Sequence, residues 1–176
     1  AIFRAFESVI PERLSAGGAT TSGLLLFAGK HENGDWATLY ETHGGGEGAR
    51  IDRDGAPVTR VHLSNVMNTP AEVIEAEYPI RIESQRLRSG SGGAGAHRGG
   101  EGLHREYLVL TDAMSLTTMF ERRIIPPYGL QGGEDGALFR IHLITADGQC
   151  TGLPGKTNVR LGNGDRVILE SSGGGG

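Results

Sequence analysis

Hydrophobic and polar residues alternate with a period of two along most of the chain. In 80–87, Ile80 and Ile82 fall on one face and Arg81 and Glu83 on the other, the pattern of a sheet that water wets on one side. Such alternation, or compact apolar runs between Gly, Asp and Asn, predicts strands at 22–28, 36–42, 58–63, 80–87, 104–110, 114–120, 137–145, 157–161 and 166–170. Tight turns are predicted at the dipeptides Asn33-Gly34, Asp54-Gly55, Asp147-Gly148 and Asn163-Gly164.

Helical periodicity is confined to two short stretches. Apolar residues recur at helical spacing over 3–11, where a proline interrupts the backbone hydrogen bonds. In the second stretch, Thr69 is predicted as the N-cap, Pro70 as the first helical residue and Glu72 as the partner in a capping box, and Pro79 ends the helix. We therefore expect a mainly β fold (β-rich α+β) of antiparallel sheets with Gly-rich loops and two short helices, in a single domain over 1–176.

Glycine is the most unusual part of the composition, with 30 of 176 residues. The glycines cluster at 44–50, 89–102, 129–136 and 173–176, without the strict three-residue period of collagen. Successive glycines can turn several N–H groups toward one point and so bind an anion, or they can let a ligand or another chain approach closely. They can also serve the tight turns and bulges of a crowded β fold. Local chemistry leaves both interpretations open.

Charge and cysteine content limit the classes of binding partner and the cellular compartment that we expect. The net charge of −4 gives no general attraction to nucleic acid or to anionic membranes. Cys150 is the single cysteine, which suits a reducing compartment, and the apolar runs are too short to cross a bilayer. We expect a soluble, cytoplasmic protein that binds neither nucleic acid nor a membrane.

A short stretch at 150–157 ends like a phosphate-binding P-loop. However, its first required glycine is Cys150, and Thr157 leads into a predicted strand instead of the helix that would hold the phosphate. We therefore predict no ATP site there.

The densest group of catalytic side-chain types lies at 62–75. His62 can act as a general base beside the amides of Asn65 and Asn68, with Glu75 in the helix that follows. The alternative is that the two amides build an Asx-turn and the glutamates solvate the helix. Glu121-Arg122-Arg123 offers a second choice, between a carboxylate or phosphate fork and a surface charge cluster. The histidine spacings and the lone cysteine predict no metal site.

An ordered set of motifs resembles the C-terminal part of the hydantoinase B/oxoprolinase family. The motifs are ETHGGGEGAR (41–50), HLSNVMNTPAEVIE (62–75), EYP (77–79), SGGAG (91–95), RGGEG (98–102) with 105–106, Arg123 with PYGL (127–130) and 132–133, GD (164–165) and the final GGGG (173–176). That family includes B-type subunits of ATP-dependent N-methylhydantoinases, the corresponding half of 5-oxoprolinase, and related subunits of acetone and acetophenone carboxylases.

The resemblance implies a division of labour. An A-type partner subunit binds ATP and Mg and activates the substrate, and the B-type subunit opens a cyclic amide such as a hydantoin or 5-oxoproline. The family's B-type subunit is longer, and its divalent metal is held in an N-terminal region without a counterpart here. We therefore expect a C-terminal fragment that works with that region and the partner, that holds no cofactor itself and that is inactive alone.

Candidate site residues follow from the motifs and the resemblance together. The candidate catalytic residues are His62, Asn65, Asn68 and Glu75, and the candidate substrate-binding residues are His43, Gly45, Gly46, Arg98 and Arg123. A region of an ATP-dependent ketone carboxylase and a non-catalytic assembly module are the alternative functions.

Overall fold

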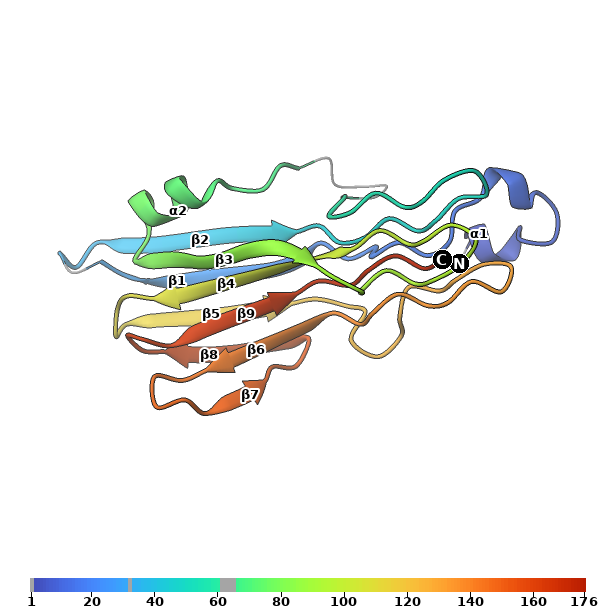
Figure 1. Cartoon of the computed structure of the whole chain (residues 1–176). Coiled ribbons are helices and arrows are strands. Elements are labelled where there is room, and N and C mark those ends of the chain that lie inside the picture. Colours follow the sequence, from blue (N-terminus) through green and yellow to red (C-terminus); the bar gives the residue numbers. More distant parts are fainter. Residues whose placement is uncertain (1, 32, 61–65) are drawn as a thin grey trace.

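The computed structural model describes residues 2–31, 33–60 and 66–176 and is mainly β (Figure 1). The strands in these ranges are β1 (Gly23–Lys30), β2 (Trp36–His43), β3 (Ile80–Arg88), β4 (Gly102–Val109), β5 (Met114–Met119), β6 (Arg140–Ile144), β7 (Cys150–Gly152), β8 (Lys156–Leu161) and β9 (Arg166–Glu170). They form one sheet in the order β2-β1-β5-β8 and another in the order β3-β4-β9-β6-β7, and neighbouring strands are antiparallel. The predicted fold class is confirmed.

The two sheets pack face to face over a hydrophobic core. Alternate residues of β1, such as Leu25 and Phe27, are buried, and so are Tyr107 and Val109 of β4 in the other sheet. The rings of Phe27 and Tyr107 are 5.2 Å apart between centroids and join the layers. Each such side chain contributes about 1.5–3 kcal/mol through burial, so the period-2 pattern accounts for this part of the fold.

The helices are shorter than predicted. The first, α1, spans Ile2–Ala5, and Pro11 begins a short 3-10 helix, η1 (Pro11–Arg13), because proline suits the first turn of a helix. The second, α2, spans Ala71–Glu77 and packs beside β3, with Ile74 buried.

The predicted start of α2 is wrong in detail. Pro70 occupies the N-cap position with an extended backbone, and no side chain caps the helix, so the box between Thr69 and Glu72 does not form. Instead, the Thr69 carbonyl accepts a hydrogen bond from Arg105. Pro79 does end the helix, because the residue before a proline favours an extended conformation, as Tyr78 shows.

Two strand predictions differ from the structure. Residues 58–60 of the predicted strand 58–63 contribute only an isolated bridge from Thr59 to Gly45, and 61–63 lie outside the described residues. Strand β7 was not predicted; it occupies the start of the P-loop-like stretch, and Thr157 lies in β8, not in a helix.

Three of the four predicted turn glycines have a positive φ: Gly34, Gly148 and Gly164. Gly55 is the exception. A Cβ atom there would lie 2.0 Å from the carbonyl oxygen of Glu47, so this glycine permits a close approach of two backbones and not a turn.

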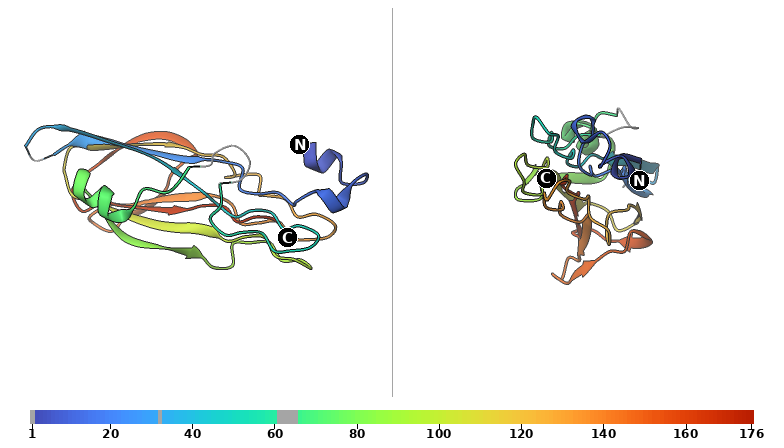
Figure 2. Two further views of the ribbon diagram at one scale, coloured as in Figure 1. Left: turned by 90° about the horizontal axis from the view of Figure 1, so that it is seen from above. Right: turned by 90° about the vertical axis from the view of Figure 1, so that its right-hand side faces the viewer.

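Most clustered glycines form a second architectural unit, which we call the glycine bundle. Its extended segments continue from the strands toward the end of the molecule that lies away from α2 (Figures 1 and 2). They are 15–19, 44–50, 54–59, 91–100, 127–137 and 171–176. Successive residues of the central segment donate to different neighbours: Gly174 N to Gly100 O, Gly175 N to Gly17 O, and Gly176 N to Glu134 O. The central segment is therefore bonded to three different neighbouring segments at three successive residues.

Glycine is required in the bundle because the backbones are in direct contact. A Cβ atom on Gly46, Gly173 or Gly174 would lie 1.9 Å from a carbonyl oxygen of a neighbouring segment. The N–H groups of Gly45 and Gly46 donate to the carbonyls of Thr59 and Ser172 and are therefore committed to the backbone. The glycines at 44–46 therefore form neither an anion-binding nest nor a tight turn.

Candidate functional site

Four polar side chains occupy inward positions between the two sheets. Glu41 and His43 follow the buried Leu39 along β2, and Arg105 and Tyr107 lie on the inward face of β4. All four are at most 3% exposed. We call this set the buried polar array, and such groups are stable in a core only when they satisfy one another.

The array is joined by short hydrogen bonds. His43 Nδ1 lies 2.8 Å from the carbonyl oxygen of Gly23, and His43 Nε2 lies 2.6 Å from the hydroxyl of Tyr107. Tyr107 donates to Glu41 Oε2 at 2.7 Å, and Arg105 Nη1 donates to Glu41 Oε1 at 2.6 Å. Glu41 is therefore held at both carboxylate oxygens.

The charges of the array act on the two acidic groups in opposite directions. Burial alone raises the pKa of Glu41, but the hydrogen bond and charge of His43, the charge of Arg105 and the hydrogen bond from Tyr107 outweigh it, so this pKa lies below its usual value. Burial, and then the negative charge of Glu41, raise the pKa of Tyr107 well above its usual value. Glu41 is thus the ionised member and Tyr107 keeps its proton.

A cavity of about 380 Å³ adjoins the array. Its lining residues are Ser22, Tyr40, Glu41, Thr42, Val66, Met67 and Thr69. The half-buried Arg60 donates to the backbone carbonyl and hydroxyl of Thr42 and, at 3.0 Å, to Asn68 Oδ1. Burial lowers the pKa of Arg60, although the charge of Glu41 opposes that shift. Glu41 is therefore one of the residues that line this cavity, and Arg60 is bonded to another of them, Thr42.

The structure brings part of the predicted site to this place. His43 belongs to the array, and Asn68 binds the arginine beside the cavity. His62 and Asn65 lie outside the described residues, so their catalytic role stays a prediction. Glu75 is exposed on α2 and accepts a hydrogen bond from the backbone N–H of Ile82 at 2.9 Å, which ties the helix to β3.

The other candidate substrate-binding residues lie elsewhere. Gly45 and Gly46 are packed in the glycine bundle. Arg98 is exposed and lines a cavity of about 210 Å³ near Asp54. Arg123 is exposed beside a cavity of about 620 Å³ that Arg122 and Lys156 also line. Neither arginine borders the cavity next to Glu41.

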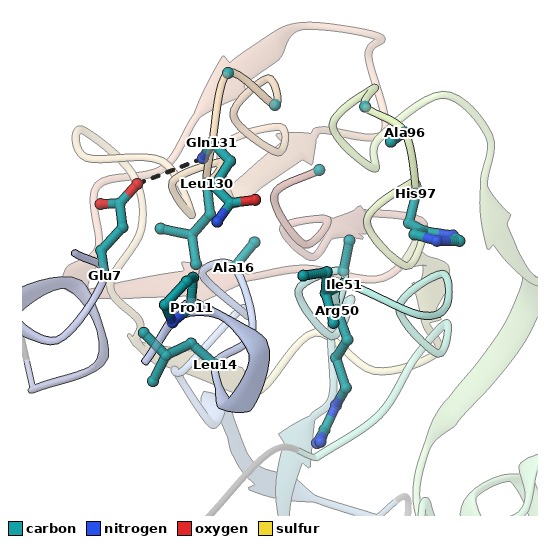
Figure 3. Close-up of a pocket in the computed structure, with 15 residues that line it drawn as sticks. Glu7, Pro11, Leu14, Ala16, Arg50, Ile51, Ala96, His97, Leu130 and Gln131 are labelled. Carbon is teal, nitrogen blue, oxygen red and sulfur yellow. Dashed lines mark hydrogen bonds between the residues drawn. The ribbon is translucent and has the colours of Figure 1, made fainter. Parts of the chain in front are cut away.

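A further cavity of about 220 Å³ lies where the N-terminal segment meets the glycine bundle (Figure 3). Leu14 and Leu130 lie on one side of it and Arg50 and His97 on the other. Glu7 there accepts a hydrogen bond from the backbone N–H of Gln131 at 3.4 Å, and Arg50 forms an ion pair with Glu47. Its polar groups are dispersed, in contrast to the connected groups of the array.

Sequence reasoning missed Glu41, Arg60, Arg105 and Tyr107 as site residues. A usable signal existed for two of them, because Glu41 and Arg105 are charged residues on strand faces that also carry apolar residues such as Leu39 and Val109. Within 2–31, 33–60 and 66–176, no three His, Cys, Asp or Glu side chains are grouped so that they could hold a metal ion.

Residues 1–176 match the hydantoinase B/oxoprolinase family over their whole length. The chain belongs to this family. The family relatives include the uncharacterized protein MJ0963 of Methanocaldococcus jannaschii, 40% identical over 99% of this chain and 30% of the relative. They also include 5-oxoprolinase 1 of Arabidopsis thaliana, 37% identical over 78% of this chain and 11% of the relative.

Solved structures agree with the family assignment. An ATP-dependent caprolactamase from Pseudomonas jessenii is 26% identical with a TM-score of 0.81, over 97% of this chain and 31% of that one. A nucleotide-free acetone carboxylase has a TM-score of 0.75 at 18% identity, over 100% of this chain and 29% of that one, and shows the shared fold. The hydantoinase B/oxoprolinase chain described here thus spans less than a third of the length of these proteins. Among its described helices, none has the length and apolar character to cross a membrane.

Proposed function

We propose that this chain forms part of the ring-opening half of an ATP-dependent cyclic amide hydrolase acting on a hydantoin or a 5-oxoproline-like substrate. The observation that carries the proposal is the buried polar array, which places Glu41 at the wall of a cavity in a chain of the hydantoinase B/oxoprolinase family. Opening a cyclic amide requires proton transfer to the departing nitrogen, and an array of hydrogen-bonded acids and bases suits that task.

Other parts of the assembly supply the remaining chemistry in this proposal. An A-type partner binds ATP and Mg, and a divalent metal belongs to the N-terminal region of the B-type subunit. The described residues offer no cluster that fits a metal, so we derive no step of this chain through one. A relative from a Pseudomonas species, named as the putative B-type subunit of a D-/L-hydantoinase, is 30% identical over 77% of this chain and 22% of the relative, and supports a subunit arrangement.

Within the site, residues around the cavity have separable roles. Arg60 is fixed by Thr42 and Asn68 and carries a positive charge next to a wall of the cavity. A guanidinium in this position attracts the negative oxygen that forms when a carbonyl is attacked. The array behind Glu41 provides the protonic groups.

The substrate class is tested with the complete protein, its partner subunit, ATP and Mg²⁺. We expect ADP to form together with a ring-opened product when 5-oxoproline or hydantoin is supplied. The fold shared with acetone carboxylase motivates one alternative. ATP consumption that depends on bicarbonate and a ketone, with neither cyclic amide opened, would assign the chain to a carboxylase.

A structural role is the rival from a different class. Asn68→Ala removes the amide that accepts from Arg60, and the exposed Asn158→Ala in β8 is a matched control. If the site interpretation is right, Asn68→Ala lowers turnover per assembled complex and leaves assembly intact. Normal turnover together with impaired assembly would instead favour an assembly module.

A further inference from the structure

The buried polar array contains more hydrogen bonds than its ordinary protonation state can supply. Three contacts run in a line: Gly23 O to His43 Nδ1, His43 Nε2 to Tyr107 Oη, and Tyr107 Oη to Glu41 Oε2, at 2.8, 2.6 and 2.7 Å. Each contact needs one proton between its two heavy atoms. A neutral histidine, a tyrosine and an ionised glutamate supply only two.

The Gly23 carbonyl determines which of the three contacts lacks a proton. This carbonyl can only accept, so Nδ1 of His43 must carry a proton. Because Tyr107 has a single proton, it can satisfy either His43 or Glu41, and the other contact needs a further proton. Leaving two acceptors in contact inside the core costs about 1–3 kcal/mol, and a third proton in the array removes that cost.

The neighbouring charges decide where the third proton rests. Arg105 Nη1 donates to Glu41 Oε1 at 2.6 Å, and the positive charge of Arg60 also acts on Glu41, so this carboxylate stays ionised. His43 Nε2 is the remaining site for that proton and lies 3.5 Å from Glu41 Oε2. On β4, Tyr107 and Arg105 face this pair, and on β1 the facing group is the Gly23 carbonyl. These three protons belong to the array as a coupled unit.

We propose that His43, Tyr107 and Glu41 form a proton relay that stores one proton between the sheets and delivers it through Glu41 to the departing nitrogen of a cyclic amide bound in the adjoining cavity. The proposal rests on the proposed function for the identity of the acceptor. Glu41 is the catalytic residue, because it borders the cavity, and His43 and Tyr107 are positioning residues that act through it.

The step balances in atoms and electrons. Water adds its oxygen to the amide carbon and releases one of its protons to bulk solvent, the carbon–nitrogen bond breaks, and the electron pair of that bond goes to the nitrogen. Glu41, ionised at rest, first receives the proton of Tyr107 at Oε2 and then passes a proton to the nitrogen. Tyr107 is reprotonated by His43 Nε2, which leaves neutral His43 with Nδ1–H still on the Gly23 carbonyl. Proton uptake from solvent restores the array after product release.

The proton count is tested by nuclear magnetic resonance on the 176-residue chain at pH 7, with ¹⁵N-labelled histidine and ¹³C-labelled glutamate. We expect both ring nitrogens of His43 to be protonated and the carboxyl group of Glu41 to be ionised. His142 lies on β6, two strands from β4 in the sheet, and serves as the reference signal of a histidine outside the array. One bare ring nitrogen on His43 beside an ionised Glu41 would overturn the proposal, because the array would then hold only two protons.

The relay is tested separately by turnover of the complete protein with 5-oxoproline or hydantoin. Tyr107→Phe interrupts the line and is expected to lower kcat by about 100-fold, the usual size of a general-acid contribution, with KM little changed. The exposed Asn158→Ala in β8, away from the cavity, is the control. An unchanged kcat per folded Tyr107→Phe complex would refute the relay, whereas absence of ring opening in the unmodified protein would count against the proposed function and leave the resonance experiment to judge the array.

Discussion

Replacing Gly46 by alanine is expected to destabilise the protein strongly, because the glycine bundle has no room for a side chain there. The new Cβ atom would lie 1.9 Å from Gly100 O and 2.3 Å from Gly174 N. Both atoms belong to backbone, so neither can rotate away. Relief requires moving segments 98–102 or 171–176, which are bonded to each other through Gly174 N and Gly100 O.

The size of this effect follows from two contributions. Forcing one extra carbon into a packed interior costs about 1–3 kcal/mol, and weakening the hydrogen bonds of Gly46 N and Gly174 N costs about 1 kcal/mol each. We therefore expect Gly46→Ala to lower the free energy of unfolding by about 4 kcal/mol. For a chain of this length that corresponds to a fall in Tm of about 8–16 °C.

Urea unfolding followed by circular dichroism measures the change, with Gly152→Ala as the matched control. Gly152 lies in β7 without a positive φ, and a Cβ atom added there would have nothing within 4 Å, so this variant should stay within about 1 kcal/mol of the parent. A loss below about 1 kcal/mol for Gly46→Ala would refute the close-packed bundle. Activity changes without a stability change would instead favour Gly46 as a binding residue.

Three further predictions concern the array and α2. Tyr107→Phe should lower the free energy of unfolding by about 2 kcal/mol, since it leaves polar atoms of His43 and Glu41 unpaired, while the exposed Tyr40→Phe should change it by less than about 0.5 kcal/mol in the same urea titration. Thr69→Ala should also cost less than about 0.5 kcal/mol, because its side chain does not cap α2; a loss near 1 kcal/mol would indicate a cap. Because folding lowers the pKa of Glu41, the unfolded state binds more protons below the ordinary value of 4.5, so the stabilisation by Glu41 is present at neutral pH and is lost as the pH falls through the lowered pKa. Urea unfolding between about pH 3 and pH 7 should show a weaker acid dependence for Glu41→Gln, and parallel curves would contradict this assignment.

The sheets were predictable from sequence because their period-2 pattern is local. The strand that contains Ile80 and Ile82 and three of the turn glycines agree with the prediction for this reason. Thr69 illustrates the limit: its spacing to Glu72 fits a capping box, but Pro70 takes the N-cap position and the Thr69 carbonyl is bonded to Arg105. A tertiary contact is thus present where a local cap was predicted.

The glycine bundle shows a different limit. Its segments lie far apart in sequence, and hydrogen bonds such as Gly175 N to Gly17 O have no periodic signature within either segment. The sequence showed that the glycines are unusual and left open an anion nest, close approach of a ligand or another chain, and tight turns. Close backbone contact between distant segments is the physical reason for them, and it became visible only in three dimensions.

The candidate site was predicted only in part. His43 and Asn68 were proposed as site residues from their motifs. The other members of the array, Glu41, Arg105 and Tyr107, were missed, and they come from two strands in different sheets. Their pairing depends on how the sheets pack. A polar residue at an inward strand position is the feature to seek in such sequences.

The central claim is that Glu41 takes part in ring opening and does not merely stabilise the core. The most direct test is the rate of ring-opened product formed per mole of folded complex by the complete protein with its partner, ATP, Mg²⁺ and 5-oxoproline or hydantoin, with Glu41 or with Glu41→Gln. Loss of a general acid lowers such rates by about 100-fold or more. The account predicts a loss of that size, and an unchanged rate per folded complex would contradict it.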